Sequence, residues 1–138
     1  MKKNHSLLSV HAKSFNWAGF FLSSNAYQKS STLYSFCRTL DDISDQNKSL
    51  SFRKKQFKQF KHAYKTRSKS KAIIKSFIDL SHKEKFSEKI ILDLFDGVET
   101  DLKQKVEFKT KKDLFTYSYR VAGTVGLMMA KIFKVTKK

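Results

Sequence analysis

No proline interrupts this chain of 138 residues, and it contains only four glycines. Three of them, Gly97, Gly123 and Gly126, fall in the last third of the sequence. Proline breaks the interior of a helix, and glycine is the other common breaker, so a chain that nearly lacks both favours long helices. The sequence shows neither the two-residue alternation of strands nor a hairpin signal or internal repeat. It therefore predicts an all-α fold.

Apolar residues at three- and four-residue spacing place the helices. The first begins at the N-cap candidates Ser23, Ser24 and Asn25 and runs to about Asp45. Further helices are expected over 51–64, 72–81, from Ser87 to about 101, and 113–135. The predicted core residues are Leu33, Phe36, Cys37, Leu40, Phe52, Phe57, Phe60, Tyr64, Ile73, Ile74, Phe77, Ile78, Leu80, Ile90, Ile91, Leu94 and Phe95.

Lysine dominates the charge, with 29 basic against 12 acidic residues and a net charge of +17. Such an excess favours anionic partners, which include nucleic acid, an anionic membrane surface and phosphorylated ligands. Lysine is also a common solvated residue on helices, and that explanation accounts for most of the excess. Charge alone does not choose among these partners.

Cysteine content and hydropathy indicate the compartment. Cys37 is the only cysteine, so no internal disulfide is possible and a reducing compartment is expected. The longest uncharged apolar run, residues 121–130, is about half the length that a membrane span needs. We expect a cytoplasmic location, with peripheral contact on the inner face of the membrane as the alternative.

Tyr34, Arg38, Asp41 and Asp45 fall within about 60° of one another on a helix. We call these four residues the aspartate stripe. Asp41 and Asp45 are one turn apart, and Mg²⁺ typically binds one or two carboxylates together with substrate phosphates. The planar guanidinium of Arg38 suits phosphate oxygens. Acidic residues near a helix C-terminus each cost about 0.3–1 kcal/mol, and a bound cation would offset that cost.

A solvated helix end, in which Arg38 pairs with Asp41 or Asp42, explains the stripe equally well on geometry alone. Three further motifs bear on the choice. They are His11–Phe15 (H-A-K-S-F), Gly97–Leu102 (G-V-E-T-D-L) and Tyr117–Met128 (Y-S-Y-R-V-A-G-T-V-G-L-M). Together with Tyr34–Asp45 (Y-S-F-C-R-T-L-D-D-I-S-D), and in this order, they resemble the squalene/phytoene synthase family, in particular its bacterial phytoene and dehydrosqualene synthases.

The resemblance implies an all-helical isoprenoid-synthase fold around a central cavity. It also implies a Mg²⁺-dependent transferase of carotenoid or other isoprenoid biosynthesis, which joins two farnesyl or geranylgeranyl diphosphates head to head. Asp41 and Asp45 would then bind Mg²⁺, assisted by Asp42, while Tyr34 and Arg38 contact the diphosphate. The remaining implied substrate-binding residues are His11, Ala12, Lys13, Ser14 and Phe15 on the diphosphate and Val121, Ala122, Val125 and Gly126 along the prenyl chains. Glu99 and Asp101 either face the cavity or lie on a solvated helix end.

Two departures from the family pattern limit this interpretation. Ala12 stands where many members have serine. The family domain is also about twice as long, and its second aspartate-rich motif, of the N-x-x-R-D-x-x-x-D type, would follow Gly126, where this sequence has only lysines as charged residues. We therefore expect residues 1–138 to form a single partial domain, the N-terminal half of the fold, which is inactive by itself.

Three functions remain open at this point. The chain is the N-terminal part of a phytoene-synthase-like transferase, which we place first. Alternatively, it is a non-catalytic prenyl-diphosphate-binding remnant, or a subunit that a second chain completes. A small basic helical protein that binds nucleic acid is the third candidate, but no specific nucleic-acid-binding motif is present and the aspartates would stay unexplained.

Overall fold

The computed structural model describes residues 23–103 and 107–134, and these residues form helices and connections without a strand. The helices are α2 (Ser24–Asp45), α3 (Leu50–Lys65), α4 (Ala72–Lys83), α5 (Glu88–Thr100), α6 (Lys111–Ser118), the π-helical turn η2 (Tyr119–Gly123) and α7 (Thr124–Ile132). The predicted all-α fold is confirmed.

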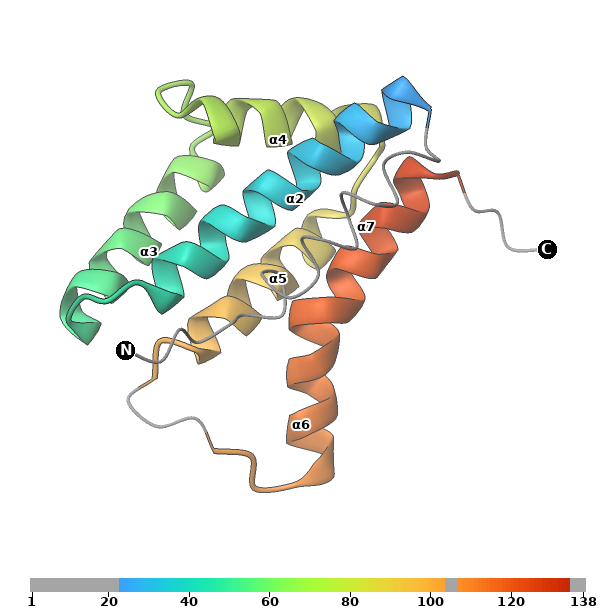
Figure 1. The fold of residues 1–138 in the computed structure, drawn as a ribbon. Helices are drawn as coiled ribbons and strands as arrows, with labels where there is room; N and C mark the ends of the chain where they lie inside the picture. Colours follow the sequence, from blue (N-terminus) through green and yellow to red (C-terminus); the bar gives the residue numbers. More distant parts are fainter. Residues whose placement is uncertain (1–22, 104–106, 135–138) are drawn as a thin grey trace.

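Helix α2 lies at the centre of the arrangement and contacts α3, α4, α5 and α7. Figure 1 shows α3 at one edge, α4 across one end, and the continuous element α6–η2–α7 along the opposite edge. The side chain of Ser23 accepts a hydrogen bond from the Ala26 N–H at 3.2 Å and caps α2, as the sequence predicted. Both ends of α2, Ser24 and Asp45, agree with the prediction.

The core is largely aromatic and is built around Phe36 of α2, which is fully buried. Its ring stacks on Phe77 of α4 with centroids 3.7 Å apart and meets Phe95 of α5 edge-on at 5.9 Å. Phe60 of α3 lies 5.6 Å away. Pairs of this kind add stability beyond their buried area. One residue thus joins four helices.

Most predicted core positions are buried, but Phe52 is 40% exposed, so its assignment to the core is wrong. Phe57, Phe60 and Tyr64 form the buried face of α3. Phe52 lies five residues before Phe57, which turns the two side chains about 140° apart on the helix. Apolar character alone does not place a residue on the buried stripe.

The predicted helix over 113–135 is not one regular helix. It begins at Lys111, where Thr110 and Asp113 form a capping box, and ends at Ile132. Between α6 and α7 the backbone widens into η2, where the Thr124 N–H reaches the Tyr119 carbonyl. The Thr124 hydroxyl donates to the Arg120 carbonyl at 2.7 Å, and this bond satisfies the acceptor that a regular α-helix would use for the Thr124 N–H.

Gly97 lets α5 and η2 pack closely. A Cβ atom at this position would lie 2.7 Å from Cβ of Arg120 and 2.9 Å from Cγ1 of Val121. Both distances are shorter than side chains tolerate, so an alanine here would push two helices apart. Gly126 differs, because nothing lies within 4 Å of its Cβ position.

We predict that Gly97→Ala lowers the free energy of unfolding by about 1–3 kcal/mol, because it overpacks the α5–η2 contact. Gly126→Ala is the matched control. It adds the same methyl group to an exposed helical position and should stabilise the protein by up to about 1 kcal/mol. Urea denaturation measures both, and equal effects of the two substitutions would contradict this packing argument.

Candidate functional site

The aspartate stripe lies along the C-terminal half of α2. Leu33, Phe36, Cys37 and Leu40 are buried on the core side of the helix. Tyr34 and Asp41 are half-buried, whereas Arg38, Asp42 and Asp45 are exposed. Because the apolar face of α2 is buried, the polar face that carries the aspartate stripe must point away from the core.

Arg38 is held loosely. Its Nη1 donates to the hydroxyl of Tyr34 at 3.1 Å, and its Nε lies 3.9 Å from Oδ2 of Asp42. The bond to Tyr34, followed by the charge of Asp42, raises the pKa of the Arg38 guanidinium. An exposed ion pair at this distance contributes little stability. The Arg38–Asp42 pair of the solvated-end alternative is thus present, and the carboxylates of Asp41 and Asp45 remain to be explained.

Asp45 has a strongly perturbed carboxyl group. Partial desolvation, then the charges of Asp41 and Asp101, and then a hydrogen bond with Asp41 raise the pKa of Asp45 to about 6. Because Asp45 is exposed as a residue, the charges of the neighbouring carboxylates account for much of this rise in its pKa. The two stripe aspartates are therefore close enough to share one proton or one cation.

Asp101, at the C-terminal end of α5, supplies the third carboxylate. Desolvation and the charge of Asp41 raise its pKa, although its hydrogen bond from Tyr117 acts in the opposite direction. The Tyr117 hydroxyl of α6 donates to Oδ1 of Asp101 at 2.6 Å. Burial and this bond raise the pKa of Tyr117. Three helices thus converge on one acidic cluster, which we define as Asp41, Asp45 and Asp101.

The sequence analysis left Asp101 undecided and gave Tyr117 no role. Both residues lie in the quoted motifs, G-V-E-T-D-L and Y-S-Y-R, but only the packing of α5 beside α2, and of α6 against α5, brings them to the stripe. Of the two acids left undecided, Asp101 faces Asp41 and Asp45, whereas Glu99 is exposed.

The acidic cluster fits a divalent cation that a ligand helps to bind. Within residues 23–103 and 107–134, no three His, Cys, Asp or Glu side chains stand close enough to hold a metal ion without other ligands. Asp41 and Asp45 offer two adjacent carboxylates, and their mutual repulsion is the cost that a cation would remove. Two carboxylates plus phosphate oxygens make a typical Mg²⁺ site.

The four residues predicted along the prenyl chains lie on η2 and α7. Val121 and Val125 are half-buried, while Ala122 and Gly126 are exposed. Leu114, Phe115 and Leu127 of the same continuous element are 45%, 69% and 47% exposed. These seven residues give the element a partly exposed apolar surface, which we call the α6–α7 face, although Val125 also packs against the core. Tyr117, within the same element, reaches the acidic cluster.

Five predicted substrate-binding residues, His11, Ala12, Lys13, Ser14 and Phe15, lie outside the described residues. Their contacts with a diphosphate stay a prediction. In the described part of the chain, no helix combines the length and the apolar character that crossing a membrane requires.

The arrangement is that of an all-helical protein with paired carboxylates, an arginine and a tyrosine on one central helix. The family model for squalene/phytoene synthase matches residues 8–138. The chain therefore belongs to the squalene/phytoene synthase family.

Two curated relatives agree with this assignment. The chain is 29% identical, over 93% of its length, to a 4,4'-diapophytoene synthase of Staphylococcus haemolyticus, and covers 46% of that protein. It is 30% identical, over 95% of its length, to a bifunctional lycopene cyclase/phytoene synthase of Phycomyces blakesleeanus, and covers 25% of that one. It thus spans less than half the length of either relative.

We predict that Asp45→Asn stabilises the protein at pH 7 and has little effect at pH 4. Because the pKa of Asp45 in the folded chain, about 6, exceeds its ordinary value, the free energy of unfolding should fall as pH rises from about 4 to about 6. The gain at pH 7 should reach at most about 1 kcal/mol, since Asp45 is exposed. Urea denaturation at both pH values measures it, with Asp79→Asn on α4 as the control. An equal effect of Asp45→Asn at the two pH values would contradict the coupling.

Proposed function

We propose that this chain supplies the first diphosphate site of a transferase that joins two prenyl diphosphates head to head. The observation that carries the proposal is the acidic cluster on α2 and α5, in which partial burial and then the charges of Asp41 and Asp101 raise the pKa of Asp45 to about 6. Membership in the squalene/phytoene synthase family and likeness to two carotenoid-forming synthases support the same function.

In this proposal Asp41 and Asp45 hold Mg²⁺, with Asp42 beside them. The ion, when bound, would stabilise negative charge on the departing diphosphate. Arg38 donates to phosphate oxygens, and its guanidinium can turn toward them because the contacts with Tyr34 and Asp42 are weak and exposed. Tyr34 offers its hydroxyl from the neighbouring turn. Asp101 adds negative charge near the cation, and the 2.6 Å bond from Tyr117 fixes its orientation.

The prenyl chain would extend along the α6–α7 face. Ala122 and Gly126 have small side chains or none, and the space at Gly126 is open. Burying a long hydrocarbon against these exposed apolar side chains releases water from both surfaces. Residues 11–15 are also proposed to contact the diphosphate. The substrate would be farnesyl or geranylgeranyl diphosphate.

A second candidate is a binding subunit that acquires activity only with another chain. The exposed α6–α7 face favours it, because an apolar surface of this kind on a soluble domain usually has a partner. The partner would carry an N-x-x-R-D-x-x-x-D helix, which supplies carboxylates for the second diphosphate. An adjacent reading frame without such a helix would argue against a split enzyme.

Binding of farnesyl diphosphate should require Mg²⁺ and should weaken at least 10-fold in Asp41→Ala/Asp45→Ala, because the cation loses both protein ligands. Isothermal titration calorimetry with and without Mg²⁺ measures this. Asp79→Ala/Glu99→Ala is the matched control, since it removes two exposed acids outside the acidic cluster. Binding that ignores Mg²⁺ but falls steeply with salt would instead indicate a general basic surface.

Incubated alone with farnesyl or geranylgeranyl diphosphate and Mg²⁺, residues 1–138 should form no C30 or C40 hydrocarbon, because one diphosphate would lack its metal ligands. Chromatography of the extracted products tests this. A detectable hydrocarbon would show that the second aspartate-rich motif is dispensable. Product that appears only after addition of a chain bearing that motif would support the subunit alternative.

A further inference from the structure

The positive charge of the chain is concentrated in one stretch of sequence. Between Asp45 and Asp79 there are eleven lysines and arginines and no aspartate or glutamate. Helix α3 occupies the middle of this stretch, and its basic residues are Arg53, Lys54, Lys55, Lys58, Lys61 and Lys65. Helix α5 has the opposite balance, one lysine among four acids, so the two signs of charge are segregated between elements, and this segregation calls for its own explanation.

On α3 the lysines are ordered. Lys54, Lys58, Lys61 and Lys65 fall within about 60° of one another and span about 16 Å along the helix. We call these four residues the lysine stripe. The buried side of α3, formed by Phe57, Phe60 and Tyr64, lies on another part of its circumference. Helix α3 lies at one edge of the arrangement (Figure 1) and packs on α2, on α4 and, through Phe57 and Phe60 against Phe95, on α5. Lys61 faces α5 and is half-buried, whereas Lys54, Lys58 and Lys65 are exposed.

Most of this charge is uncompensated within the described residues. Lys61 alone in the stripe approaches an acid, Oδ1 of Asp96 at 3.9 Å. Lys54, Lys58 and Lys65 are exposed and form no ion pair in the part of the chain that the structure describes. Lys55, on the adjoining flank, is also exposed.

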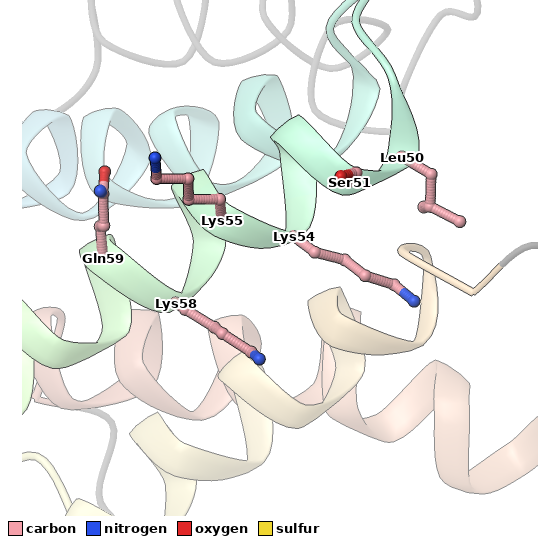
Figure 2. Close-up of a pocket in the computed structure, with 6 residues that line it drawn as sticks. All are labelled: Leu50, Ser51, Lys54, Lys55, Lys58 and Gln59. Atoms are coloured by element: carbon pink, nitrogen blue, oxygen red, sulfur yellow. The ribbon is translucent and has the colours of Figure 1, made fainter.

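The surface beside the stripe is hollowed. Leu50, Ser51, Lys54, Lys55, Lys58 and Gln59 line an open depression of about 660 Å³. Figure 2 shows Lys54 and Lys58 extending to one side of α3 and Lys55 to the other. Lys54 and Lys58 also border a second hollow, of about 490 Å³, whose lining includes Lys103 and Arg120 together with the acids Asp96 and Glu99 of α5. The exposed lysines of α3 thus lie on two sides of the helix (Figure 2), and those toward α5 share their hollow with two acids.

We propose that α3 is the surface by which this protein docks on an anionic lipid bilayer, with the lysine stripe and Lys55 against the phosphate headgroups. Lysines near a membrane of negative surface potential each contribute to binding without needing a fixed partner geometry. Phe52, 40% exposed on the first turn of α3, lies about 150° around the helix from the centre of the stripe, so the stripe would contact the headgroups through charge alone.

A lipid surface fits better than a nucleic acid. Recognition of base edges and backbone phosphates relies heavily on arginine, whose planar group binds bidentately. Arg53 is the one arginine of α3, and it donates to the carbonyls of Ser44 at 2.8 Å and Lys48 at 3.2 Å. The cationic side chains that remain available on this surface are therefore lysines. Their ammonium groups bind negative charge without distinguishing one base sequence from another.

The test is cosedimentation of residues 1–138 with vesicles of phosphatidylcholine containing 30% phosphatidylglycerol, at low salt and without Mg²⁺ or prenyl diphosphate. Lys54→Gln/Lys58→Gln/Lys65→Gln should lower the partition coefficient roughly 100-fold, at about fivefold per lysine. Lys111→Gln/Lys112→Gln/Lys131→Gln is the matched control, because it removes three exposed lysines from α6 and α7. The control should bind within a few-fold of the parent chain.

Equal losses in the two triple variants would overturn the proposal, since they would show that net charge and not α3 drives binding. Binding of the parent to pure phosphatidylcholine vesicles, or tighter binding to polyuridylate than to anionic vesicles, would also overturn it. Circular dichroism should show unchanged helix content in both variants. Asp41→Ala/Asp45→Ala should bind vesicles like the parent chain, so the diphosphate site and the docking surface are tested separately.

Discussion

The packing of Phe36 is the interaction on which the rest of the structure depends. Its ring contacts Phe60, Phe77 and Phe95 and so ties α2 to α3, α4 and α5. Phe36 and Leu40 are fully buried, and this fixes the rotation of α2 about its own axis. Because the aspartate stripe lies on the same rigid helix, the stripe can point in only one direction. Hydrophobic packing therefore positions the polar site, as is usual for sites built on regular elements.

The charges of the molecule are divided between two regions. Asp41, Asp45 and Asp101 collect at one end of α2 and α5, and partial burial together with their mutual repulsion raises the pKa of Asp45. The lysines of α3 lie on the neighbouring edge, where Lys61 alone of the lysine stripe forms an ion pair within the described residues. We propose that each region serves a ligand of opposite charge, a cation for the first and an anionic surface for the second.

Features that lie within one helix could be predicted from the sequence, whereas contacts between helices could not. Ser23 capping, both ends of α2, and the aspartate stripe follow from spacing within one helix, and the structure confirms that arrangement. Asp101 joins the site because α5 packs beside α2, and Tyr117, sixteen residues later, joins it because α6 packs against α5. No periodicity predicts that contact. Phe52 was misplaced because hydrophobicity was given more weight than its angle relative to Phe57.

The π-helical turn changes which side chains of α7 face the core. Its wider turn holds one more residue than an α-helical turn, so every side chain of α7 is rotated by about 100° relative to a regular continuation of α6. A helical wheel drawn through residues 111–132 as one helix would thus assign Gly126 and Met128 to the wrong sectors. Deleting one residue within 119–123 would rotate α7 by about 100° and turn the buried side chains of Thr124, Met128 and Ile132 away from their present contacts, with the composition of the element almost unaltered.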